Sequence, residues 1–192
     1  MSNVKISPRN TVLLLIIVFT AIVRLTGAIN MEYNPFVVFT PIGAMALFGG
    51  SYFRGNIKPF LLPLVALLAS DVVLSFTAYS SFRVGLLYPG WFWVYLAFGL
   101  MTMAGKILIK RVTIRSVGLA TLVTVMIHWL VSDIGGCLAE VNTAGVLSTY
   151  RQRLISALPY ELNFLAATSI YSAILFGTFE WMQRRNPSLR TA

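Results

Sequence analysis

Residues Val117–Leu138 read VGLATLVTVMIHWLVSDIGGCL, and this stretch decides the fold. Its apolar residues do not alternate with polar ones, as they do in a half-buried strand. The run also has about the length of 20 residues that a helix needs to cross a membrane. A lipid-exposed segment must satisfy its own backbone hydrogen bonds, which a helix does without a neighbour. The stretch therefore predicts a transmembrane helix.

Five further stretches of at least 18 residues have the same character. In chain order, the predicted spans are Thr11–Ala28, Phe36–Phe53, Pro59–Ala78, Leu86–Ile107, Val117–Leu138 and Leu158–Met182. Of the 192 residues, 57% are hydrophobic and 11% are charged, whereas a soluble domain carries roughly a quarter charged residues. The sequence therefore predicts an all-α, polytopic membrane protein with six transmembrane helices in one domain, residues 1–192.

Lysine and arginine residues in the connections between the spans give the orientation, because short basic loops stay in the cytoplasm. Of the 15 basic residues, 11 fall on one side of the predicted spans: Lys5, Arg9, Arg54, Lys58, Lys106, Lys110, Arg111, Arg115, Arg184, Arg185 and Arg190. The other side has Arg83, Arg151 and Arg153. We therefore expect both termini in the cytoplasm and the chain in a bacterial inner membrane. The net charge of +9 then reflects topology and membrane lipid, and no nucleic-acid partner is expected.

Four ionisable residues fall inside the apolar stretches: Arg24, Asp71, His128 and Asp133. Such a residue costs about 2.5–3.5 kcal/mol at the centre of a membrane, so it usually has a function. The predicted orientation places Arg24, Asp71 and Asp133 in the outer half of the membrane and His128 near the middle.

Polar residues near the outer ends of the spans extend this group. Together they predict a pocket that opens to the periplasm and binds a small molecule, because such sites combine apolar walls with a few convergent polar groups. The predicted ligand-binding residues are Arg24, Asn34, Asp71, His128, Asp133, Tyr160 and Asn163. We expect Arg24 to hold a carboxylate, phosphate or amide oxygen.

Two other interpretations of the same residues stay open. Arg24 pairs with Asp71 or Asp133 simply to neutralise charge and tie the helices together. Alternatively, the carboxylates and His128 form a proton relay, for which the cytoplasmic half offers Glu180 as a continuation.

Catalytic motifs are missing from the sequence. There is no Walker phosphate loop, serine elbow, metalloprotease helix or dinucleotide fingerprint, so we expect no enzyme activity and no permanently bound cofactor. His128 and Cys137 are too far apart along one helix to share a metal ion, so no metal site is predicted.

Several motifs resemble an uncharacterised bacterial family of predicted transport proteins. They are NPFVVFTPIGAMALFGG (Asn34–Gly50), Pro63-Leu64, Ser70-Asp71, Leu158-Pro159, Asn163, Tyr171, Leu175-Phe176-Gly177 and Glu180. That family is similar in length, architecture and glycine-rich N-terminal pattern to the S components, the substrate-binding subunits of energy-coupling factor (ECF) vitamin transporters. The resemblance implies an ECF S-component-like bundle.

The same resemblance implies uptake of a vitamin-type micronutrient, either together with a separate ECF-type ATPase and transmembrane module or alone. Solitary S components that transport cobalamin ligate the corrinoid cobalt through a pocket cysteine, so cobalamin is the first guess for the ligand. The resemblance would give that part to Cys137 or His128, although no matching motif places either residue. The chain departs from the pattern at Asp133, Cys137 and Thr168, where asparagine, tryptophan and aspartate are expected.

Small residues support a rival function. Ser169, Ala173 and Gly177 repeat at four-residue spacing, which lets helices approach closely in lipid. The alternative to uptake is therefore a structural or assembly subunit of a larger membrane complex.

Overall fold

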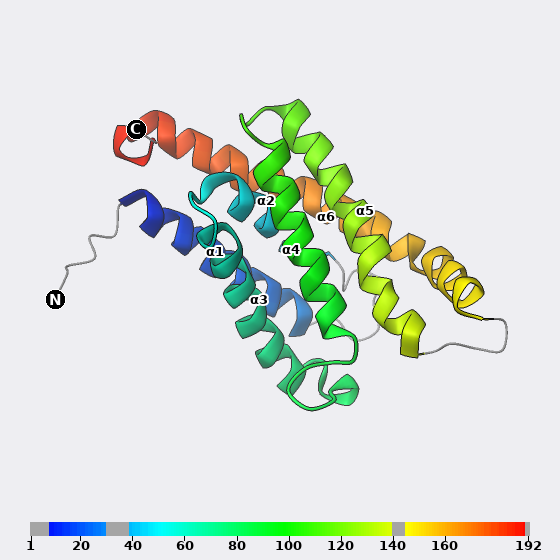
Figure 1. Cartoon of the computed structure of the whole chain (residues 1–192). Helices are drawn as coiled ribbons and strands as arrows, with labels where there is room; N and C mark the ends of the chain where they lie inside the picture. Colours follow the sequence, from blue (N-terminus) through cyan, green and yellow to red (C-terminus); the bar gives the residue numbers. More distant parts are fainter. Residues whose placement is uncertain (1–7, 30–38, 140–144, 191–192) are drawn as a thin grey trace.

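The computed structural model describes residues 8–29, 39–139 and 145–190, which form a bundle of helices (Figure 1). Within this described part, the structure has six α-helices, two short 3-10 helices and no strand. They are α1 (Pro8–Ile29), α2 (Ile42–Tyr52), α3 (Lys58–Phe76), η2 (Ser80–Phe82), α4 (Trp91–Leu108), α5 (Ile114–Ala139), α6 (Val146–Arg185) and η3 (Pro187–Leu189). The predicted all-α fold is confirmed. Five of the helices, all except α2, are long and apolar enough to cross a membrane, as in a multi-pass membrane protein.

Helix α2 differs from the predicted span Phe36–Phe53. It has 11 residues, Ile42–Tyr52, and residues 36–38 lie outside the described ranges. At 1.5 Å per residue it is about 16 Å long, half of the roughly 30 Å hydrocarbon core. It is nevertheless the most enclosed of the helices, since nine of its 11 residues are buried, whereas α6 has nine buried residues among 40. A side chain at Gly50 would collide with the backbone of Thr102 and Lys106 in α4, so glycine allows α2 and α4 to meet.

Helix α6 is longer than the predicted span Leu158–Met182. It has 40 residues and begins at Val146, so it is about 60 Å long. It continues through Pro159, although proline removes one backbone hydrogen bond. Arg151 and Arg153, which were expected in a loop, therefore lie in the helix.

Hydrogen bonds with α5 fasten this extra length of α6. Trp129 Nε1 donates to the Leu154 carbonyl at 3.0 Å, and the Tyr150 hydroxyl donates to the Leu130 carbonyl at 2.5 Å. These contacts form only after the two helices have come together, so hydropathy along the chain does not reveal them.

The start of α1, the end of α6 and the α2–α3 and α4–α5 connections lie at one end of the bundle, along the upper side of Figure 1, and they carry most of the basic residues. There, Arg9 Nη2 donates to the Tyr52 carbonyl at 2.7 Å, and the Tyr52 hydroxyl donates to Glu180 at 2.6 Å. These bonds join the start of α1 to the ends of α2 and α6. We call this the basic end, defined by Arg9, Arg54, Lys58, Lys106, Lys110, Arg111, Arg115, Arg184, Arg185 and Arg190. The start of α4 and the ends of α3 and α5 form the opposite end.

Candidate functional site

A buried ion pair joins α1 to α3. Arg24 Nη2 lies 2.5 Å from Asp71 Oδ1, and Arg24 Nη1 donates to the Ser70 hydroxyl at 2.5 Å. Arg24 is 9% exposed and Asp71 is 1% exposed. Two charges this deep are retained only when they are paired and hydrogen-bonded.

Two tyrosines complete the coordination of Asp71. The hydroxyls of Tyr95, in α4, and Tyr88, just before it, donate to Asp71 Oδ2 at 3.0 and 3.2 Å. Burial, together with the charge of Asp71, raises the pKa of the Tyr88 hydroxyl well above its ordinary value, so it stays a neutral donor. Both oxygens of Asp71 are therefore occupied by side chains of the protein, as expected for a tie between helices.

A second group of ionisable residues joins α5 to α6. His128 Nδ1 lies 2.8 Å from Glu161 Oε1, and the His128 ring packs against Phe164 with ring centroids 4.3 Å apart. Phe164 in turn lies against Gly43, at the start of α2. Glu161 is 6% exposed, and no described residue offers a hydrogen-bond partner to its other oxygen, Oε2. A buried carboxyl oxygen of this kind calls for a water molecule, a proton or a ligand.

A half-buried pair lies next to this group. Arg153 Nη2 in α6 is 3.6 Å from Asp133 Oδ1 in α5. Asp133 is also close enough to Glu161 and His128 to interact with their charges. Four ionisable residues thus meet along the seam between α5 and α6.

A polar cavity of about 480 Å³ lies over the opposite-end half of this seam. We call it the outer cavity, and it is lined by Asp133, Thr149, Gln152, Arg153, Ser156, Ala157 and Tyr160. Tyr160 is 48% exposed, so the cavity is open to the surroundings. It presents a carboxylate, a guanidinium, an amide and hydroxyls, a set that contains both hydrogen-bond donors and acceptors.

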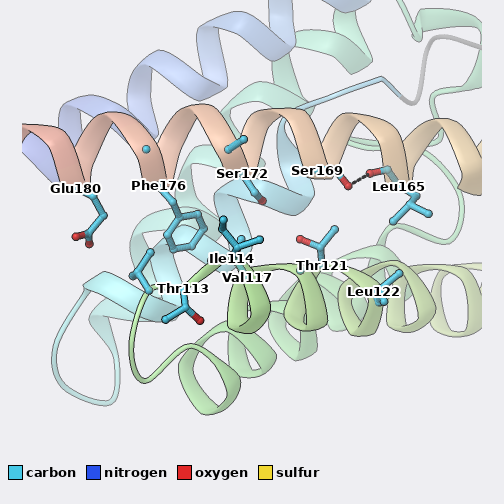
Figure 2. Close-up of a pocket in the computed structure, with 14 residues that line it drawn as sticks. Thr113, Ile114, Val117, Thr121, Leu122, Leu165, Ser169, Ser172, Phe176 and Glu180 are labelled. Carbon is cyan, nitrogen blue, oxygen red and sulfur yellow. Dashed lines mark hydrogen bonds between the residues drawn. The ribbon is translucent and has the colours of Figure 1, made fainter.

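A second cavity, of about 540 Å³, lies between α5 and α6 toward the basic end (Figure 2). We call it the inner cavity. Its walls are mostly apolar, and its polar lining residues are Thr113, Thr121, Ser169, Ser172 and Glu180. Glu161 and Phe164 lie between the α6 residues that line the outer cavity and those that line the inner one.

The structure separates the seven predicted ligand-binding residues. Arg24 and Asp71 form their own ion pair, whereas His128 and Asp133 belong to the α5–α6 seam. Tyr160 lines the outer cavity, and Asn163 lies half-buried on α6 near it in sequence. Asn34 is outside the described residues. Cys137 is buried, and its thiol contacts the Val146 carbonyl at 3.5 Å.

Sequence reasoning missed two members of the seam. Arg153 was assigned to a loop, because the first three turns of α6 carry too many polar residues for a span. Glu161 was not among the predicted ligand-binding residues. Its spacing from Thr168 and Ser172 by seven and eleven residues, close to whole helical turns, was the available signal.

In the residues that the structure describes, no three His, Cys, Asp or Glu side chains are grouped so that they could hold a metal ion.

No curated protein and no solved structure matches the chain. Residues 4–189 match the model of a family of unknown function, DUF6580. This chain belongs to that family.

Proposed function

We propose that this chain is a membrane uptake protein that binds a vitamin-type micronutrient in the outer cavity and moves it across the bacterial inner membrane. The observation that carries the proposal is the outer cavity itself, where Asp133, Arg153 and Tyr160 line a polar space next to the buried His128–Glu161 pair. Intramembrane ionisable residues usually mark the path of a substrate or an ion.

The basic end supplies the orientation for this proposal. Basic residues stay in the cytoplasm, so the opposite end, with the outer cavity, faces the periplasm. In this topology the chain crosses the membrane six times, with α2 as the inner part of the second crossing, and both termini are cytoplasmic. The proposal follows the resemblance of the sequence motifs to the S components of ECF transporters.

The ligand-binding set differs from the one that the sequence suggested. His128, Asp133, Tyr160 and Asn163 remain, while Arg153 and Glu161 join them. Arg24 and Asp71 hold the helices in place, since their hydrogen-bonding groups already have partners inside the protein.

Cobalamin is the first ligand to test. His128 suits a cobalt ligand better than Cys137, because its Nδ1 contacts Glu161, and a carboxylate on one ring nitrogen orients the other toward a metal. The Cys137 thiol is enclosed between α5 and the start of α6. Cobalt would then be brought by the ligand and not held as a resident metal.

A thermal-shift experiment tests the proposal. Purified protein in detergent is heated with each of a panel of vitamins, cobalamin and cobinamide included, and the unfolding midpoint is measured. One vitamin should raise it, since a ligand at 100 times its Kd adds about 2.7 kcal/mol of stability. The variants Asp133→Asn and Arg153→Ala should lose the shift.

Arg151→Ala is the matched control, because Arg151 lies on the same helix but outside the cavity lining. This variant should keep the shift. Binding in the outer cavity would be contradicted if no vitamin in the panel changes the unfolding midpoint. It would also be contradicted if Arg153→Ala keeps the full rise of the midpoint.

One observation favours the assembly-subunit alternative. Ser169, Ala173 and Gly177 are exposed on α6 and line the inner cavity, so within the described part of the chain this small-residue face is left open. If the alternative holds, a bulky Gly177→Leu should release a membrane partner during purification in mild detergent and leave ligand binding unchanged. Under the uptake proposal, no subunit is lost.

A further inference from the structure

The inner cavity is a groove on the surface of the bundle. Ile114 and Leu122, which line it from α5, are 95% and 54% exposed, and Gly177 on α6 is exposed as well. In Figure 2 the two helices run along its opposite sides. Because both helices are long and apolar enough to cross a membrane, the groove opens toward lipid.

The inner cavity has about the length of one membrane leaflet. Its lining residues on α5 run from Ile114 to Leu122, which is about 12 Å at 1.5 Å per residue. On α6 they run from Leu165 to Glu180, which is about 22 Å. One leaflet contributes about half of the roughly 30 Å hydrocarbon core. The cavity therefore extends from the basic end to about the middle of the membrane.

The walls of the inner cavity suit a hydrocarbon chain. Val117, Leu165 and Phe176 supply apolar surface from both helices. Gly118 and Gly177 add room, because a carbon placed on either residue would have no neighbouring atom within 4 Å. An apolar chain that enters this space leaves water or detergent and gains contacts with both helices.

Three arginines lie around the part of the inner cavity that is at the basic end. Arg111 and Arg115 flank the lining residues 112–114, and Arg184 follows Glu180 by four residues on the same face of α6. All three arginines are exposed. Their guanidinium groups form no hydrogen bond or ion pair with the part of the chain that the structure describes. They are therefore available to a phosphate, which an arginine binds with two parallel hydrogen bonds.

One carboxylate, that of Glu180, lies at the same end of the inner cavity. Its Oε1 accepts a hydrogen bond from the hydroxyl of Tyr52, in α2, at 2.6 Å. This carboxylate is thus already engaged within the bundle. Three positive charges and one negative charge leave this end positive, which favours an anion next to the apolar space.

We propose that the inner cavity binds an anionic glycerophospholipid from the cytoplasmic leaflet. One acyl chain lies between α5 and α6, and the phosphate meets Arg111, Arg115 and Arg184 at the basic end. Basic pockets between transmembrane helices on the cytoplasmic side suit such headgroups. A helix of a partner subunit would fill the apolar part, but it would not by itself supply an anion for the three arginines.

This inference goes beyond the proposed uptake function and uses different residues. It needs the basic end to face the cytoplasm, but it does not need a vitamin in the outer cavity. The two proposals fail separately, because lipid binding is measured without a vitamin and the vitamin panel is measured without added lipid.

Thermal unfolding in detergent measures the binding of lipid. The protein is depleted of lipid and then titrated with dioleoylphosphatidylglycerol, which is anionic, or with dioleoylphosphatidylcholine, which has the same chains but no net charge. Phosphatidylglycerol should raise the unfolding midpoint clearly more than phosphatidylcholine does. Glycerol 3-phosphate, which has the phosphate but no chain, should leave the midpoint unchanged. Equal effects of the two lipids, or a full effect of glycerol 3-phosphate, would overturn the proposal.

A triple variant tests the three arginines. Arg111→Gln, Arg115→Gln, Arg184→Gln should weaken the binding of phosphatidylglycerol about 100-fold, since each arginine near the membrane surface contributes roughly a fivefold gain in affinity. The charge-matched control also removes three positive charges from the basic end, but at residues that do not line the inner cavity or adjoin its lining: Arg54→Gln, Lys58→Gln, Lys106→Gln. It should bind phosphatidylglycerol like the wild type. Equal weakening in the two triple variants would show that only the total charge matters, and the site would be rejected.

A phosphatidylglycerol with a photoactivatable diazirine in one acyl chain locates the chain. After irradiation in detergent, mass spectrometry should find the crosslinks on the residues of α5 and α6 that line the inner cavity. Gly118→Leu should abolish them, because the leucine side chain occupies the open space beside Gly118. Gly99→Leu is the control and should keep them, since Gly99 has equally open space but lies in α4, outside the cavity lining.

Two results of the crosslinking experiment would contradict the site. Crosslinks spread evenly over the exposed apolar side chains of α1 and α3 would show ordinary contact with lipid. A membrane protein that copurifies and is released by Gly118→Leu, with no phosphatidylglycerol crosslinked, would assign the inner cavity to a partner helix.

Discussion

Arg24 and Asp71 meet at 2.5 Å, so the last turns of α1 are tied to the middle of α3 by a fully buried ion pair. Removing one member leaves the other charged and alone in an apolar bundle. We therefore expect Arg24→Ala to lower the free energy of unfolding by about 3–5 kcal/mol. Thermal unfolding in detergent, followed by circular dichroism, measures this.

The double variant Arg24→Met, Asp71→Leu is the control for that prediction. With both charges removed, no unpaired charge remains, so it should be more stable than Arg24→Ala. If Arg24→Ala instead unfolds at the wild-type temperature but no longer binds a ligand, Arg24 belongs to a binding pocket and not to a tie between helices.

Tyr88 and Tyr95 donate to the same oxygen of Asp71, so each substitutes in part for the other. Tyr88→Phe and Tyr95→Phe should each cost about 1 kcal/mol of unfolding free energy. The double variant should cost more than the sum, because Asp71 Oδ2 then has no donor. Urea or guanidinium titration of the wild type, the two single variants and the double variant gives the coupling energy between the tyrosines. If the unfolding free energies lost in the single variants simply add in the double variant, the two tyrosines do not substitute for each other.

Gly50 sets the distance between α2 and α4. A methyl group at this position would meet the backbone of Thr102 and Lys106, which cannot rotate away, so Gly50→Ala should destabilise the protein by about 1–3 kcal/mol. Gly99→Ala, in α4, is the control, because no described atom lies within 4 Å of the added carbon. It should be neutral or slightly stabilising, since alanine favours a helix. The unfolding midpoints of the two variants in detergent make the comparison.

Cys137 should be inert in the folded protein, since it is 2% exposed and its thiol contacts the Val146 carbonyl. A soluble maleimide should label it fully after denaturation in sodium dodecyl sulfate and very slowly before. Val146→Pro should leave labelling slow, because the contact uses the carbonyl and not the side chain. Fast labelling of the native protein would return Cys137 to the list of residues able to reach a ligand.

The long helices were predictable from the sequence, because about 20 apolar residues without alternation have one stable form in lipid. The length of α2 was not predictable from the sequence. The predicted span Phe36–Phe53 is apolar along its whole length, but the described helix begins only at Ile42. The first turns of α6 were missed because their residues are polar, although they are helical. Residues such as Gln152 and Arg153 are polar, and packing against α5 holds them in a helix.

The sequence singles out Arg24, Asp71, His128 and Asp133 as ionisable residues inside apolar stretches, but it does not give their partners. Depth along each helix follows from residue counting, whereas the face that each side chain presents depends on how the helices rotate against one another. The sequence therefore allowed Arg24 to pair with Asp71 or with Asp133. The structure pairs Arg24 with Asp71 and gives Asp133 to Arg153, a residue that the sequence had placed in a loop.

The half-length of α2 has a consequence for biogenesis. A segment of about 16 Å cannot hold itself across a bilayer as an independent helix. It owes its position to α4 and α6, which the ribosome makes later, as the close approach of Gly50 to α4 and of Gly43 to α6 shows. We therefore expect newly made α2 to stay at the translocon or the membrane surface until those partners arrive, and the second apolar segment to be integrated among the last.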